Sequence, residues 1–148
     1  EQKKRGLELT ANHKVNDSLD LEASYTYIKV ENNDAGVGFE RDWNYMPNLY
    51  RLGVRYHAEK WNADLFLRYG SGCSTGVHNR KQSYAENDYL TLDLTINYQA
   101  APNIKIFAKG YNLLNEAYCE QAGYDSAMGT YSSPAQSRRF LIGAEYSF

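Results

Sequence analysis

The chain has 148 residues, the size of one ordinary domain. Its net charge is −2, with acids and bases interspersed and no basic stripe, which argues against nucleic acid as a partner. Tyrosine occurs 14 times, and no apolar run approaches the length of a transmembrane helix.

Apolar and polar residues alternate with a period of two along most of the chain, which predicts β-strands with two different faces. From Tyr89 to Gln99, for example, every second residue is Leu, Ile or Tyr, and the residues between them are Thr, Asp or Asn. The pattern predicts seven strands, at roughly Gly6–Val15, Leu19–Val30, Asn48–His57, Trp61–Gly70, Tyr89–Gln99, from Ile104 onward, and Arg138–Phe148.

The connections between these strands alternate strictly between short and long. The short ones are turns near Asn16–Ser18, Ala58–Lys60 and Ala100–Asn103, and the long ones are loops at about Glu31–Pro47, Ser71–Asp88 and Glu116–Gln136. This alternation is typical of outer-membrane barrels, which have periplasmic turns at one rim and extracellular loops at the other. A soluble β-sandwich shows the same residue alternation, but it does not readily explain the loop lengths.

The two predicted faces also differ in chemistry. One is apolar in mid-strand with aromatic residues near the strand ends, as expected for two aromatic belts at the membrane interfaces. The other carries many acids and bases, so it must be wet, internally paired or covered by a polar partner. The predicted inner belt is Tyr56, Trp61, Tyr98, Tyr146 and Phe148, and the outer belt is Tyr25, Tyr27, Tyr50, Tyr69 and Phe140.

Two motifs near the end of the chain point to a family. Gly143, Tyr146 and the terminal Phe148 resemble the closing-strand signal that the barrel-assembly machinery recognises in bacterial outer-membrane barrels. The segment from Ile104 to Tyr118 resembles the "N-L-x-[ND]-x-x-Y" ending found in TonB-dependent outer-membrane receptors, carried here by Asn112, Leu113, Asn115 and Tyr118.

The resemblance implies an all-β fold, a transmembrane antiparallel β-barrel in the bacterial outer membrane. That family has a 22-stranded barrel with a plugged lumen. Because seven strands would leave two open edges in lipid, we expect residues 1–148 to be the C-terminal portion of the barrel, about seven strands, with the plug domain and the earlier strands outside this chain. No signal peptide opens the chain, and we expect one to have been removed.

The resemblance also implies a function and a set of partners. The function is TonB-dependent transport of a scarce ligand such as a ferric siderophore, haem or cobalamin. The expected partners are outer-membrane lipid, the remaining barrel strands, the plug domain, the TonB energy-coupling complex acting on the plug and its TonB box, the barrel-assembly machinery and the small-molecule ligand.

Nothing in the sequence indicates an enzyme, a metal site or a cofactor. His13, His57 and His78 fall on a strand face, a turn and a loop at different rims, and no Ser/His/Asp set shares a rim. Carboxylates such as Asp20 and Glu22 are better explained as lumen charges facing a plug than as acid–base partners.

Ligand specificity is expected in the long loops, because binding residues concentrate on loops held by a rigid scaffold. Aromatic and polar side chains suited to a siderophore, haem or corrinoid occur in two of these loops. The candidate ligand-binding residues are Trp43 and Tyr45 in the first, and Tyr124, Asp125, Met128 and Tyr131 in the third.

The two cysteines, Cys73 and Cys119, fall in long loops on the same predicted rim. Because the cell surface is oxidising, we hypothesise a disulfide between them that braces the loops. Two other functions remain open at this point: a passive outer-membrane pore whose charged lumen sets selectivity, and a soluble β-rich binding module.

Overall fold

The fold is described by a computed structural model, which covers residues 1–148 except 34–35, 37, 43–44, 73–87 and 126–128; side chains between 120 and 133 are not described. Among the described residues, no helix is long and apolar enough to span a membrane. The strands are β1 (Gln2–Asn16), β2 (Leu19–Asn32), β3 (Glu40–Arg41), β4 (Asn48–His57), β5 (Trp61–Ser71), β6 (Tyr89–Ala101), β7 (Ile104–Tyr111), β8 (Cys119–Asp125), β9 (Gly129–Pro134) and β10 (Arg139–Tyr146).

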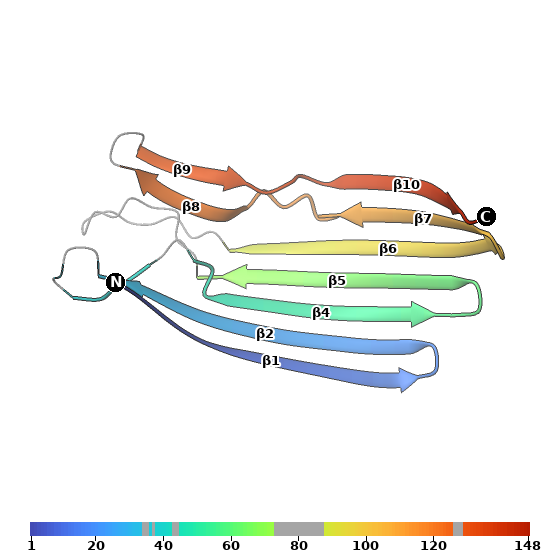
Figure 1. The fold of residues 1–148 in the computed structure, drawn as a ribbon, viewed down its shortest axis with the longest axis horizontal. Coiled ribbons are helices and arrows are strands. Elements are labelled where there is room, and N and C mark those ends of the chain that lie inside the picture. The colour runs from blue at the N-terminus through green and yellow to red at the C-terminus, as the bar shows by residue number, and fades with distance from the viewer. Residues whose placement is uncertain (34–35, 37, 43–44, 73–87, 126–128) are drawn as a thin grey trace.

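The long strands form one antiparallel wall in the order β1-β2-β4-β5-β6-β7-β10, with β3 paired to the end of β2. β8 and β9 form a separate hairpin at the end of the wall where the long connections lie, which we call the loop end. Figure 1 shows the three short turns and the C-terminus at one end of the wall, and the long connections at the other. The seven predicted strands, their order and the alternation of connections are therefore confirmed.

The predicted loops were wrong in two places, because they contain strands. β2 continues to Asn32 and pairs there with β3, with Glu31 opposite Arg41, and the third loop contains the β8–β9 hairpin. β1 likewise starts at Gln2 instead of Gly6. These extensions carry polar residues on both faces, so the period-two pattern that reveals a half-buried strand is lost although the backbone ladder continues.

The register aligns the apolar residues of all seven strands of the wall on one face. Tyr25 pairs with Tyr50 and Tyr50 with Tyr69, with ring centroids 4.7 and 5.9 Å apart. Near the short turns, Trp61 pairs with Tyr98 at 4.4 Å. Rings of the outer belt therefore stack across β2, β4 and β5, and rings of the inner belt across β5 and β6, as cross-strand aromatic pairs favour.

This apolar face has no protein cover among the described residues. Ile142 is 78% exposed, Phe140 68% and Leu52 54%, whereas the buried hydrophobic residues are only Val30, Tyr89 and Tyr118. Apolar surface of this extent on one side of a sheet requires an apolar partner, and a membrane barrel finds that partner in lipid.

A matched pair of arginine substitutions tests which face meets lipid. Ile142 lies on the apolar face in the middle of β10, and its neighbour Leu141 lies on the polar face opposite Lys109. Ile142→Arg should lower the stability of the full-length barrel by about 2–4 kcal/mol, the cost of a cation near the bilayer midplane. Leu141→Arg should cost no more than about 1 kcal/mol, from repulsion by Lys109 opposite it. Urea midpoints of the vesicle-embedded barrel provide the measurement, and equal losses would contradict the assignment of faces.

Candidate functional site

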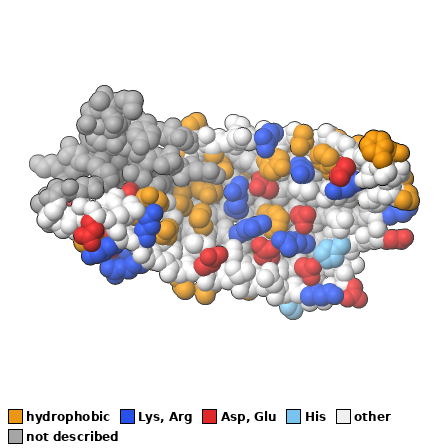
Figure 2. Space-filling view, viewed as in Figure 1, with side chains coloured by type: hydrophobic (Ala, Val, Ile, Leu, Met, Phe, Trp, Pro, Cys, Tyr) orange, Lys and Arg blue, Asp and Glu red, His pale blue; other side chains and the backbone are white. Residues whose placement is uncertain are grey.

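The face opposite the lipid surface carries a network of charged side chains that we call the polar face. Arg55 lies 2.8 Å from one carboxylate oxygen of Glu22 and 3.8 Å from Asp64, and Arg51 lies 3.6 Å from the other oxygen of Glu22. These pairs connect β2, β4 and β5. Figure 2 shows Lys, Arg, Asp and Glu side chains gathered over the middle of the wall on this face.

The ion pairs continue toward the β10 edge of the wall. Arg68 lies 3.4 Å from Asp93, and Lys105 lies 3.5 Å from Glu145. His57 Nε2 lies 2.9 Å from an Asp20 oxygen, near the short turns. All these side chains stay partly exposed, so the charges are paired with one another and still wet. Such pairs each contribute little to stability, but together they fix where charge is presented.

Aromatic rings lie among the charges, each packed on a glycine of the neighbouring strand. Phe66 faces Gly53, Tyr89 faces Gly70 and Phe107 faces Gly143, and each pair is a direct cross-strand pair. A Cβ built on these glycines would lie 2.5–2.6 Å from the opposing ring. The glycines therefore let the rings lie flat on the sheet. The Arg51 guanidinium lies 4.0 Å from the Phe66 ring centroid, which favours a cation–π contact.

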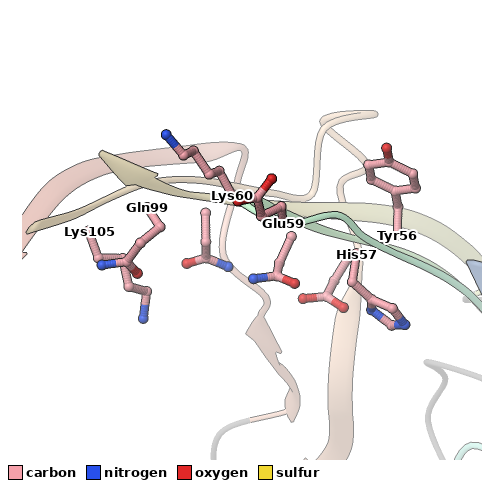
Figure 3. A pocket seen from close by; sticks show the side chains of 9 residues that line it. Tyr56, His57, Glu59, Lys60, Gln99 and Lys105 are labelled. Atoms are coloured by element: carbon pink, nitrogen blue, oxygen red, sulfur yellow. The ribbon is translucent and has the colours of Figure 1, made fainter. Parts of the chain in front are cut away.

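The described part of the polar face has hollows, of which three matter here. The first, about 390 Å³, is near the short turns, where Figure 3 shows Gln99 and Lys105 on one side and Tyr56 and His57 on the other. The second, about 380 Å³, lies between Arg51, Arg68 and Tyr89, and the third, about 360 Å³, lies beside Asp93. Among the described residues, no group of three His, Cys, Asp or Glu is placed to hold a metal ion.

The motif that suggested the family forms a compact turn after β7, which we call the rim corner (Asn112–Tyr118). Asn112 is 4% exposed and donates from Nδ2 to the carbonyls of Glu116 (2.8 Å) and Gln136 (3.1 Å). Its Oδ1 accepts from the Glu116 N–H at 2.9 Å. Asn112 and Asn115 have positive φ angles of 48° and 55°, a conformation that Asn tolerates better than most residues.

The other motif residues anchor the rim corner on the wall. The Asn112 N–H donates to Asp93 at 2.8 Å, and the Leu113 N–H donates to the Leu92 carbonyl at 2.8 Å. The Tyr118 ring stacks on Tyr89 at 4.2 Å. Asn115 Oδ1 accepts from the Arg138 N–H at 3.3 Å, so the corner also fixes the entry to β10. The sequence revealed this motif, and the structure supplies a physical role for each of its residues.

The structure describes four of the six predicted ligand-binding residues, and few of their side chains. Tyr124, Asp125 and Tyr131 belong to the β8–β9 hairpin, where only the backbone is described. Trp43 and Met128 lie outside the described residues. Tyr45 is exposed, and the Lys4 ammonium lies 5.3 Å from its ring centroid. The ligand-binding role of these residues stays a prediction.

The predicted disulfide and assembly signal are placed only in part. Cys119 begins β8, and Cys73 lies outside the described residues, so their pairing stays a prediction. The Tyr146 and Phe148 rings meet edge to face at 5.1 Å at the end of the wall. Gly143 packs under the Phe107 ring, and its recognition by the assembly machinery, with that of Tyr146 and Phe148, stays a prediction.

Two features of the polar face escaped the sequence analysis. The His57–Asp20 pair is diagonal, since Asp20 pairs directly with Arg55, and diagonal pairs become visible only once the register is known. The ring–glycine pairs had a sequence signal: Gly53 and Gly143 occupy polar-parity positions, and so do Phe66 and Phe107 on the next strands.

A double-mutant cycle separates packing from recognition at Gly143. Gly143→Ala should destabilise the assembled barrel by about 1–3 kcal/mol, because the new methyl group meets the Phe107 ring. In a Phe107→Ala background, the same substitution should cost less than about 0.5 kcal/mol. The measurement is the urea midpoint of purified barrel. An undiminished cost in the Phe107→Ala background would show that the ring does not require this glycine.

Comparison with known proteins gives one family match. The model of the family described as "TonB dependent receptor-like, beta-barrel" matches residues 1–113. A search of curated proteins gave no match.

Several solved structures share the fold. They include the copper transporter OprC (TM-score 0.78, 21% identity, 99% of this chain and 24% of that one). The siderophore receptor PiuA from Acinetobacter baumannii is also similar (0.71, 18%, covering 98% and 22%). The ferripyoverdine receptor of Pseudomonas aeruginosa is a third (0.71, 15%, covering 99% and 20%). This chain therefore spans between a fifth and a quarter of the length of these proteins.

Proposed function

The chain belongs to the TonB-dependent receptor-like β-barrel family of the bacterial outer membrane, and from this premise we propose that it forms wall and extracellular loops of an active importer. The cargo we propose is a scarce ligand of the ferric siderophore, haem or cobalamin class. One observation carries the proposal. A single sheet exposes an uncovered apolar face on one side, and on the other a face where charged side chains form ion pairs and aromatic rings lie among them.

In this proposal the two faces and the two ends of the wall have different roles. The apolar face contacts lipid, and the polar face contacts water and the plug domain inside the barrel. The β8–β9 hairpin lies at the loop end, and in this proposal its residues Tyr124, Asp125 and Tyr131 contact the ligand. In this proposal the TonB complex acts on the plug, and these residues perform no chemistry themselves.

The names of similar structures support a chelated metal ion as cargo. PiuA is named as a siderophore receptor, the Pseudomonas aeruginosa protein as a ferripyoverdine receptor and OprC as a copper transporter. A passive pore would use the same wall, but there the charges would act on a permeating ion. Here the described charges of the central strands pair with one another at 2.8–3.8 Å, which favours a wall that contacts a polar partner over an ion filter.

Uptake by the full-length receptor tests this proposal. The receptor is expressed in a strain that lacks its own iron and cobalamin receptors, with or without the TonB protein. The probes are ⁵⁵Fe-labelled catecholate and hydroxamate siderophores, ⁵⁵Fe-haem and ⁵⁷Co-cobalamin. We expect one probe to accumulate only when TonB is present. Diffusion of small sugars into receptor-containing liposomes, with no TonB-dependent uptake of any probe, would favour a passive pore and contradict the proposal.

Loop variants locate the ligand contacts in the same assay. Tyr124→Ala and Tyr131→Ala should each raise the half-saturating ligand concentration about tenfold, as loss of an aromatic binding contact does. The matched control is Tyr98→Ala, which removes an aromatic ring at the opposite end of the wall, on the lipid side. An equal effect of all three substitutions would show that the loops do not set affinity.

A further inference from the structure

Two arginines lie directly opposite each other on the polar face, and we call them the arginine pair. The register pairs Arg51 of β4 with Arg68 of β5. Their other cross-strand neighbours, Ser24 and Thr91, are uncharged. Like charges directly opposite one another on a sheet are destabilising. The arginine pair is therefore not explained by the stability of the wall.

The carboxylates of the wall satisfy the arginine pair only loosely. Arg51 lies 3.6 Å from Glu22, whose other oxygen lies 2.8 Å from Arg55. Arg68 lies 3.4 Å from Asp93. The Arg68 Nε is buried, and no described residue accepts a hydrogen bond from it. Because an unpartnered buried donor is costly, the site needs a further acceptor.

The order of the rows along the strands makes the arginine pair accessible from the loop end. Glu22 and Asp93 lie one row nearer the short turns. The row nearer the loop end is uncharged, and its members are Thr26, Leu49, Gly70 and Tyr89. The Arg51 and Arg68 side chains remain 43% and 41% exposed. An anion that enters from the loop end therefore meets the arginine pair before it meets Glu22 or Asp93.

The hollow of about 380 Å³ described above lies at the arginine pair, on its loop-end side. Besides the two guanidinium groups, its lining includes the hydroxyl-bearing residues Ser24 and Thr26, the apolar side chains of Met46 and Leu49, and Tyr89. Small-molecule pockets have volumes of about 300–1,000 Å³ and combine an apolar lining with a few polar groups. The hollow therefore offers two cations beside a surface that suits hydrocarbon or an aromatic ring.

We propose that the arginine pair binds an anionic oxygen group of the cargo, a carboxylate or a catecholate, whose attached apolar part fills the hollow. The planar guanidinium fork matches such oxygens and pairs with them in a bidentate manner. This inference rests on the proposed function and narrows it to anionic cargo. Ferric tricatecholates and haem, which carries two propionates, fit the site. Neutral ferric trihydroxamates and cobalamin, which has no carboxylate or catecholate, do not.

Equilibrium binding to the purified full-length receptor tests the proposal, with ferric tricatecholate, haem, ferric trihydroxamate and cobalamin as probes. The variant R51Q/R68Q should weaken binding of the anionic probe on the order of a hundredfold, because two charge-assisted contacts are lost. R51K/R68K keeps the charges without the fork and should bind within about tenfold of the parent. The matched control K14Q/K105Q removes two cations from the same face near the short turns and should bind as the parent does.

A further variant removes the acid that competes for Arg68. Asp93 accepts a hydrogen bond from the Asn112 N–H at 2.8 Å, and Asp93→Asn keeps an oxygen that can accept it while removing the charge 3.4 Å from Arg68. This variant should tighten binding of the same anionic probe by up to about fivefold, because Arg68 no longer pairs with a carboxylate of the wall. A purely structural role of Arg68 predicts no such gain.

The outcomes separate this inference from the proposed function. TonB-dependent uptake of ferric trihydroxamate or cobalamin, or unchanged binding of the anionic probe by R51Q/R68Q, would overturn the inference and leave active import in place. Absence of TonB-dependent uptake of every probe would contradict the proposed function and this inference with it. The gel mobility of unheated samples shows that each variant is folded. If R51Q/R68Q does not fold, Asp93→Asn decides, and no gain in affinity overturns the proposal.

Discussion

The hydrogen-bonding demand of the backbone in hydrocarbon is the constraint on which this structure depends. Each strand of the wall is paired with its neighbours along an antiparallel ladder, with register shifts near the short turns at Lys14/Asn16 and Gln99/Ala101, so the interior strands leave few N–H or C=O groups for lipid. Once the backbone is fixed in this way, side chains alternate between two environments. One environment is lipid, and the other is the water-filled or protein-filled inside of the barrel.

The wall has almost no hydrophobic core, so cross-strand contacts replace core packing. On the polar face, rings of Phe66, Tyr89 and Phe107 lie on glycines of neighbouring strands, and ion pairs surround them. The rings give local rigidity without excluding water from the charges. At the loop end, the buried Asn112 side chain bonds to Glu116 and Gln136, the segments on either side of the β8–β9 hairpin. Function in this fold therefore depends on the two faces of the sheet and on the loops, which the paired strands hold in place.

Much of this architecture could be predicted from the sequence, because one pattern determines it. The period of two locates the seven long strands and separates Leu52 or Ile142 from Arg51 or Glu145. The pattern fails for β3 and the β8–β9 hairpin, because their residues do not alternate between apolar and polar. It also misses the His57–Asp20 pair and the hydrogen bonds of Asn112, which depend on register and on positive φ angles. The alternation pattern of the wall does not identify the ligand, because we propose that specificity depends on loop side chains.

A nitroxide scan along β5 of the full-length receptor in vesicles tests the central claim most directly. Single labels are placed from 62 to 68, and their collision rates with oxygen and with a water-soluble nickel chelate are measured. The account predicts that the two collision rates alternate along the strand with a period of two and in opposite phase. Labels at Ala63, Leu65 and Leu67 collide with oxygen. Labels at Asp64, Phe66 and Arg68 collide with the chelate or are shielded from both. Collision rates that show no alternation, or chelate access at Leu65, would contradict it.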